Sequence, residues 1–145
     1  MSQATDYFEG KTLEALSTLG TLNLATGAVT AGTGGYIGLL TSSPSDLSTG
    51  STVSEVSSSG TSYARIQVGS SEQGSFSGTA GSITNDSEFK WADATANWGT
   101  ITHVGLFDAA TDGNLLVYGA LQSSVDIETG DIFKIPASGF TIQMN

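Results

Sequence analysis

The stretch WGTITHVGLFDAATDGNLLVYGAL, residues 98–121, decides the fold class. The residues before its turn alternate between two faces, with Ile101 and Phe107 expected together on one of them. The pair Asp112-Gly113 supplies the turn, because glycine accepts a positive φ at little cost. The residues after the turn are apolar on both faces. A hairpin of this kind needs packing on both sides, so it is expected to be the central hairpin of a β-sandwich.

Shorter apolar runs surround this hairpin, with turn signals about every 8–12 residues, as in sandwiches and jelly rolls. The further predicted strands cover residues 36–41, 62–68, 82–84, 88–91, 125–127, 131–135 and 140–144. Residues 69–81 are rich in Gly and Ser and are predicted as a loop. The predicted fold class is therefore all-β, with a single antiparallel, jelly-roll-like β-sandwich and one short N-terminal α-helix.

The predicted helix covers residues 6–19, where Asp6 and Glu9 resemble a capping box and Gly20 follows as a stop signal. We expect residues 1–20 to form an N-terminal helix or arm and residues 21–145 to form a single sandwich domain. The helix either packs on its own domain or docks on a neighbouring subunit, and the sequence leaves both readings open.

Composition excludes several classes of function. The chain has 145 residues, four of them basic and fourteen acidic, which gives a net charge of −10. We expect neither nucleic acid nor an anionic membrane as a partner, because both require a basic surface. There are no cysteines for disulfides or thiolate-bound zinc. No apolar run is long enough to span a membrane, and residues 1–20 lack the charged-then-apolar order of a signal peptide.

No residue pattern indicates a reaction. His103 is the single histidine and has no ligand partner at i+2 or i+4, so it is predicted to be a hydrogen-bonded residue on the sheet. No G-x-S-x-G motif marks a nucleophilic serine. The Gly-rich residues 32–35 precede a strand and lack a P-loop lysine. The sequence therefore predicts no catalytic, cofactor-binding or metal-binding residue, and no enzyme.

Acidic residues cluster at two predicted turns. Asp108 and Asp112 flank the turn of the central hairpin without calcium-loop spacing, so they are predicted to form the turn. Asp126, Glu128 and Asp131 crowd a second turn and are predicted to form a solvated acidic loop.

Five aromatic residues have two possible roles, which are packing in a sandwich core and stacking on sugar rings. They are Tyr36, Tyr63, Trp91, Trp98 and Tyr118. Exposure discriminates between the two roles, because burial of both tryptophans would remove the sugar-binding reading for them.

Several motifs carry a family resemblance. Residues 98–121 with the preceding residues 94–97, the YIGLLTSSPSD segment at 36–46, the YAR triplet at 63–65 and the TGDIFKI segment at 129–135 resemble small virion proteins of tailed phages, often labelled tail-fibre-like. The resemblance covers most of the chain and implies a virion location after assembly in the host cytoplasm. It supplies no catalytic residues.

Two structural roles are compatible with this resemblance. The first is a capsid decoration or cement protein that stabilises the head by bridging capsid subunits, with the major capsid protein or other virion proteins as partners and a dimer or trimer as the oligomer. The alternative is a tail-tip or fibre-base component, and a second alternative is a carbohydrate-binding module. The candidate docking parts are the N-terminal helix, the arm of residues 20–35 and the Ser/Thr-rich loop of residues 42–60, whose length is typical of functional or mobile loops.

Overall fold

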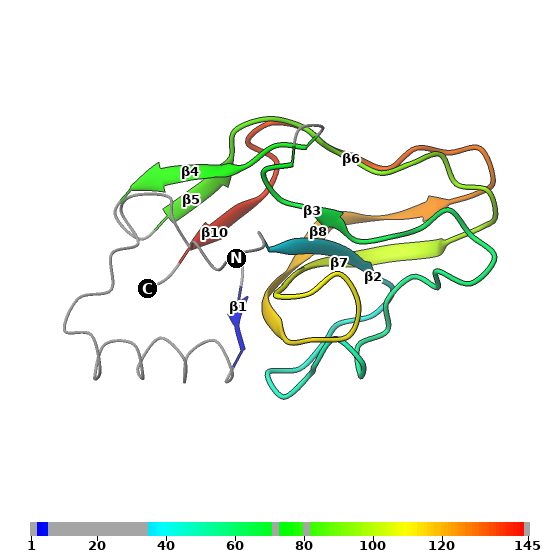
Figure 1. The fold of residues 1–145 in the computed structure, drawn as a ribbon, viewed down its shortest axis with the longest axis horizontal. Coiled ribbons are helices and arrows are strands. Elements are labelled where there is room, and N and C mark those ends of the chain that lie inside the picture. Colours follow the sequence, from blue (N-terminus) through cyan, green and yellow to red (C-terminus); the bar gives the residue numbers. More distant parts are fainter. Residues whose placement is uncertain (1–2, 6–34, 71–72, 80–81, 144–145) are drawn as a thin grey trace.

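A computed structural model of the chain describes residues 3–5, 35–70, 73–79 and 82–143 (Figure 1). Its strands are β1 (Gln3–Ala4), β2 (Tyr36–Leu40), β3 (Ile66–Gln67), β4 (Phe76–Thr79), β5 (Ser82–Asn85), β6 (Phe89–Lys90), β7 (Gly99–Phe107), β8 (Leu115–Ile127), β9 (Lys134–Ile135) and β10 (Thr141–Gln143). The predicted helix of residues 6–19 and most of the predicted arm of residues 20–35 lie outside the described residues.

The hairpin of β7 and β8 lies inside the largest sheet. This sheet has the strand order β1-β8-β7-β2-β3, and every neighbouring pair in it is antiparallel. The two residues at the turn both have positive φ, 50° at Asp112 and 66° at Gly113. The hairpin predicted from the sequence, including its turn residues, is therefore confirmed as a central element.

One face of this sheet packs against the remaining strands. These form a three-stranded sheet, β10-β5-β4, and a two-stranded sheet, β6-β9. Side chains from all three sheets meet in one apolar cluster, with Ile37 and Val104 from the large sheet, Phe89 and Ile135 from the two-stranded sheet and Ile142 from β10. All described strand pairs are antiparallel, which confirms the all-β, antiparallel class.

The other face of the large sheet carries a second, smaller cluster. Leu40, Phe107, Leu115 and Tyr118 are buried there, and Val53 from the loop between β2 and β3 packs against them. In Figure 1 this loop and the β7–β8 turn lie on one side of the sheet, while β4, β5 and β6 lie on the other. The hairpin is therefore covered on both faces, as its apolar pattern predicts.

The predicted faces of the hairpin need one correction. Ile101 belongs to the same cluster as Val104 and not to the cluster of Phe107. The cause is a register shift in which Ile101 pairs with Val125 and His103 pairs with Ala120. Four residues of β8 then lie opposite a single residue of β7, and strict alternation is lost at this irregularity.

Several predicted strand boundaries are also wrong. Residues 125–127 are the end of β8 and not a separate strand. Of residues 62–68, only Ile66–Gln67 form a strand, β3, and residues 62–65 are irregular. Strand β4 lies in residues 69–81, which were predicted as a loop. The predicted strands at 88–91, 131–135 and 140–144 shorten to β6, β9 and β10.

Candidate functional site

A buried arginine organises one side of the molecule. The side chain of Arg65 is 3% exposed, and its guanidinium carbon lies 3.5 Å from the centroid of the Phe107 ring. Nε of Arg65 donates to Oε1 of Glu55 at 2.9 Å, and Nη2 donates to Oε2 at 2.7 Å. This is the two-point arginine–carboxylate geometry, which is stronger and more directional than a single hydrogen bond.

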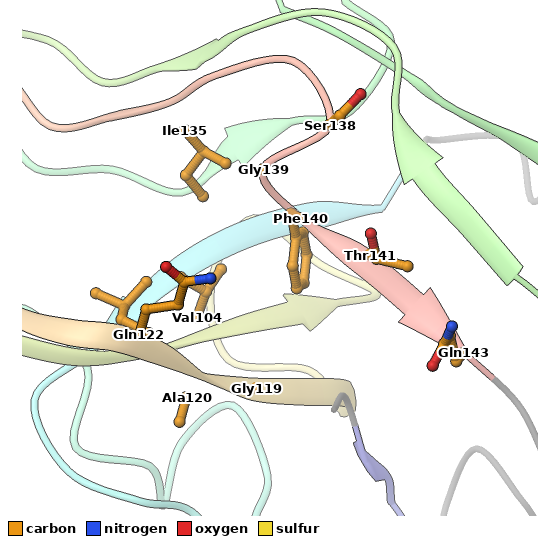
Figure 2. A pocket seen from close by; sticks show the side chains of 11 residues that line it. Val104, Gly119, Ala120, Gln122, Ile135, Ser138, Gly139, Phe140, Thr141 and Gln143 are labelled. Atoms are coloured by element: carbon orange, nitrogen blue, oxygen red, sulfur yellow. The ribbon is translucent and has the colours of Figure 1, made fainter.

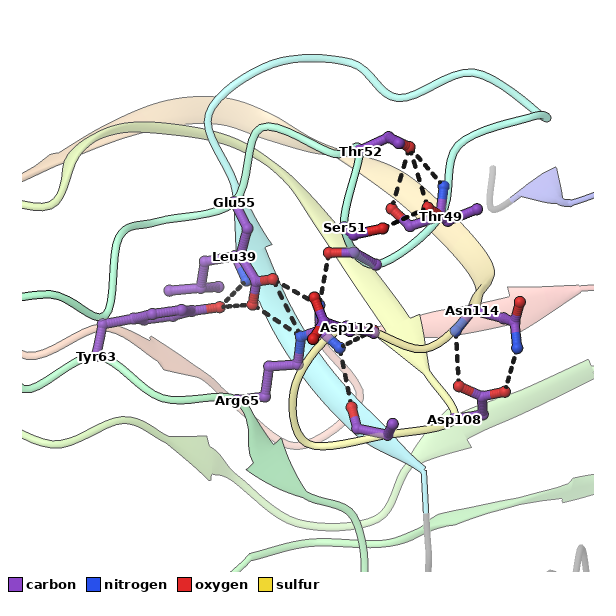
Figure 3. Close-up of polar contacts among 12 residues, drawn as sticks. Leu39, Thr49, Ser51, Thr52, Glu55, Tyr63, Arg65, Asp108, Asp112 and Asn114 are labelled. Carbon is purple, nitrogen blue, oxygen red and sulfur yellow. Dashed lines mark hydrogen bonds and ion pairs between the residues drawn. The ribbon is translucent and has the colours of Figure 1, made fainter.

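The remaining donors of Arg65 hold the two loops together. Nη1 donates to the carbonyl oxygens of Ala109 and Asp112, each at 2.9 Å, and Nη2 donates to the carbonyl oxygen of Gly50 at 3.3 Å. Figure 3 shows these contacts converging on Arg65 from the loop after β2 and from the β7–β8 turn. One side chain therefore crosslinks segments that are far apart in the sequence.

The carboxylate of Glu55 is held by a third residue. The Tyr63 hydroxyl donates to Oε1 of Glu55 at 2.6 Å and accepts from the backbone N–H of Leu39 at 2.8 Å. Burial raises the pKa of Tyr63 far above its ordinary value, and the negative charge of Glu55 raises it further. The hydroxyl thus stays neutral and connects the carboxylate to strand β2.

Main-chain contacts complete the connection. The N–H of Gly50 donates to the carbonyl oxygen of Gly113 at 2.9 Å, and Thr49 forms a β-bridge with Asn114. A Cβ atom placed on Gly50 would lie 1.7 Å from the carbonyl oxygen of Asp112, so only glycine fits there. We call the two connected segments, residues 41–56 and residues 108–114, the loop layer.

The first acidic turn predicted from the sequence lies in the loop layer. The carboxylate of Asp108 accepts from the backbone N–H and from Nδ2 of Asn114, both at 2.7 Å. Asp112 has a positive φ, and its carbonyl oxygen contacts Arg65. Both aspartates therefore shape the turn, in the way the sequence predicts.

The second acidic turn is built in a similar way. The carboxylate of Asp131 accepts from the backbone N–H of Glu128 at 2.9 Å, and Gly130 has a φ of 94°. Asp126, predicted as part of this acidic loop, lies instead in strand β8, where it pairs with Thr100 and accepts from its hydroxyl. Among residues 3–5, 35–70, 73–79 and 82–143, no group of three His, Asp or Glu side chains is placed to hold a metal ion.

His103 lies on β7 and is partly buried. Its Nδ1 is 2.8 Å from the hydroxyl oxygen of Thr102, and burial lowers the pKa of the imidazole. The residue is a hydrogen-bonded sheet histidine, as the sequence predicts. Of the Gly-rich residues 32–35, only Gly35 lies within the described part of the chain.

Both tryptophans are core residues. Trp91 is 1% exposed and packs edge-on against Phe133, while Trp98 is 5% exposed and packs edge-on against Tyr63. Tyr63 and Tyr118 are buried as well. The sugar-stacking reading that the sequence left open is therefore wrong for these two tryptophans.

A groove of about 470 Å³ lies between β8 and the segment that leads into β10. Figure 2 shows Ala120 and Gln122 on one side of it and Phe140, Thr141 and Gln143 on the other. None of its eleven lining residues is charged. Its hydroxyl, amide and apolar groups suit contact with an uncharged surface rather than proton transfer.

Sequence reasoning did not find the role of Arg65. The residue was recognised within the YAR triplet and on a strand face, but its partners come from residues 50, 55, 109 and 112. The alternation gives no signal for its burial, because it places Arg65 with Tyr63 and Gln67 on the face opposite the apolar neighbours.

Comparison with known families places the chain. Residues 3–143 match the family Gp80, described as podophage GP4 fiber I protein gp80. The chain belongs to this Gp80 family. Comparison with curated proteins found no match. Gp80 membership confirms the resemblance to tail-fibre-like phage proteins and makes the chain a component of a phage virion. The part of the chain that the structure describes contains no helix long and apolar enough to cross a membrane.

Proposed function

We propose that the chain is a non-enzymatic structural component of the tail, at the tail tip or the base of a fibre. The observation that carries this proposal is the Gp80 match over residues 3–143, because that family is described by a fibre protein. The match favours the tail alternative over the capsid-decoration reading, which had the major capsid protein as its partner. Association with other virion proteins follows from membership of the fibre family.

The geometry supports a mechanical role. The polar groups brought together at Arg65 are paired with one another, so they position loops and leave no acid or base directed at a substrate. The shared apolar cluster of the three sheets supports the proposal of a two-layer sandwich. A rigid module with braced loops is suited to transmit load between neighbouring virion proteins.

Three finer expectations remain part of the proposal. They are the division into an N-terminal arm, residues 1–20, and one sandwich domain, residues 21–145; the jelly-roll-like connections; and a homo-oligomeric state of two or three chains.

The deciding experiment is a map of the intact virion, supported by immunogold labelling of the chain. We expect label on the tail and a copy number set by the low symmetry of the tail. Label distributed over the head in hundreds of copies would overturn the tail assignment and favour the decoration role.

A further inference from the structure

The loop layer displays one leucine at the tip of an ordered turn. Leu47 is 79% exposed. The turn around it is closed by two hydrogen bonds, from the N–H of Ser45 to the hydroxyl of Ser48 and from the N–H of Ser48 to the carbonyl oxygen of Ser45, both at 2.9 Å. The neighbouring Asp46 accepts from the buried Tyr118 hydroxyl at 3.0 Å. Leu47 is therefore exposed on a turn that hydrogen bonds hold in place.

The base of this turn is fixed as well. Directly after it, Thr49 bridges to Asn114, and Gly50 is hydrogen-bonded to Gly113 and to Arg65. An apolar side chain on a preformed base loses little conformational entropy when it binds, which makes such a residue an effective anchor. Other large apolar residues exposed in the described part of the chain are far less so, with Val125 at 39% and Ile132 at 40%.

The loop layer that carries Leu47 is acidic. Asp46, Asp108 and Asp112 are exposed in the loop layer. Residues 41–56 and 108–114 contain no lysine or arginine. The nearby Arg65 is buried and its charge is paired with Glu55. The apolar anchor therefore belongs to a loop layer whose exposed carboxylates have no basic side chain within residues 41–56 and 108–114.

We propose that the loop layer is a docking surface for another virion protein, which receives Leu47 in an apolar hollow bordered by lysine or arginine side chains. Leu47 supplies the buried contact at the centre of the interface, and the exposed carboxylates of the loop layer orient the encounter with the basic border. This inference rests on the proposed function, since the partner is placed on the tail.

The test uses phage particles produced without this chain, to which the purified full-length chain is added. Leu47→Ser is compared with Val125→Ser and Ile132→Ser, which remove apolar side chains of similar size elsewhere on the surface. We expect Leu47→Ser to bind the particles at least about tenfold more weakly, and the two controls to bind as the wild type does. Thermal unfolding of each variant checks that the fold is retained.

A second variant tests the charge. Asp112→Asn removes one carboxylate but keeps the carbonyl oxygen that Arg65 contacts, and asparagine tolerates the positive φ at this position. We expect association at low salt to slow by about twofold or more, and the dependence of the rate on salt to weaken.

The outcomes separate the two proposals. Wild-type binding to tails with loss in Leu47→Ser supports both. Equal binding of Leu47→Ser and the wild type to tails overturns the docking surface and leaves the tail assignment standing. Binding of the wild type to heads overturns the tail assignment. If Leu47→Ser abolishes self-association of the purified chain, the occupant is a second copy, and the proposed basic partner is wrong.

Discussion

Replacing Arg65 by methionine is expected to loosen the loop layer and lower the stability of the whole molecule. The substitution keeps an apolar stem over Phe107 but removes the charge. It leaves the Glu55 carboxylate, whose side chain is 17% exposed, with the Tyr63 hydroxyl but without the arginine, and it leaves three main-chain carbonyl oxygens without the donor that Arg65 supplied. Breaking a buried ion pair by removing one partner costs about 3–5 kcal/mol. For a chain of this size, that loss lowers Tm by about 6–20 °C.

The matched control is Lys134→Met. Lys134 and Glu88 lie 3.5 Å apart, but their side chains are 45% and 46% exposed. An exposed pair of this kind contributes at most about 1 kcal/mol. The double variant Arg65→Met with Glu55→Gln is expected to recover about 1 kcal/mol or more relative to Arg65→Met alone, because it removes the unpaired carboxylate.

Urea unfolding gives the free energies, and amide hydrogen exchange shows where the structure opens. We expect faster exchange in residues 41–56 and 108–114 of Arg65→Met, with little change in the centre of the β7–β8 pair. If Arg65→Met and Lys134→Met lower the free energy of unfolding by the same small amount, the buried pair does not hold the loops, and the reasoning fails.

Three further predictions test other parts of the structure. In urea unfolding, Gly50→Ala is expected to lower the free energy of unfolding by more than about 2 kcal/mol, because its Cβ would overlap a carbonyl oxygen across the loop layer. Gly60→Ala has open space around its Cβ and is expected to lose only about 1 kcal/mol, because of its φ of 74°. Equal losses for the two variants would contradict this packing. Burial raises the pKa of Tyr63, so folding keeps this hydroxyl protonated. The contribution of Tyr63 to the free energy of unfolding is therefore complete below the unfolded pKa of 10.0. As the pH rises above that value, this contribution falls by about 1.4 kcal/mol per pH unit. Tyr63→Phe should flatten stability against pH above 10 in urea titrations, and an unchanged slope would refute the assignment. Because Trp91 and Trp98 are buried, their fluorescence is expected to have a short emission wavelength and to be quenched little by acrylamide. Adding neutral oligosaccharides is expected to leave this fluorescence unchanged, and strong acrylamide quenching would contradict the burial.

The central hairpin could be predicted because its information is local. The alternation before the turn, the Asp112-Gly113 pair and the two-sided apolar run after it all lie within 24 consecutive residues, 98–121. The turn residues take the positive φ angles that their side chains allow. Apolar residues on both faces of the return strand correctly indicated that each face is covered.

The register of the same hairpin could not be predicted. Alternation predicts the face of a residue only while two paired strands keep a regular register. Between the partners of Ile101 and His103, β8 contains extra residues that break this register. The side of the sheet on which Ile101 lies therefore depends on a register shift that the alternation of apolar residues does not reveal.

Strand β4 was missed for a related reason. Its sequence, FSGT, contains a single large apolar residue and a glycine, which locally favour a loop. It is a strand because β5 lies beside it in antiparallel register. Tertiary pairing here overrides local preference.

The organisation of the candidate site was the least predictable part. Arg65 acquires its role from carbonyl oxygens 15, 44 and 47 positions away in the chain. Spacing along a single sequence does not reveal which main-chain groups will converge on a side chain. The acidic turns, by contrast, were predictable because each one closes on itself within a few residues.

The loop layer has a consequence for how this chain can diverge. One face of the central sheet is covered by irregular segments whose attachment depends on Gly50, Glu55 and Arg65, while Leu47 is exposed outside that attachment. Substitution of the exposed Leu47 leaves the core and its anchoring intact, so selection can alter the outer surface without rebuilding the fold. Among descendants of a common ancestor, we expect residue 47 to change together with the partner surface that receives it, and the three anchoring residues to stay nearly invariant.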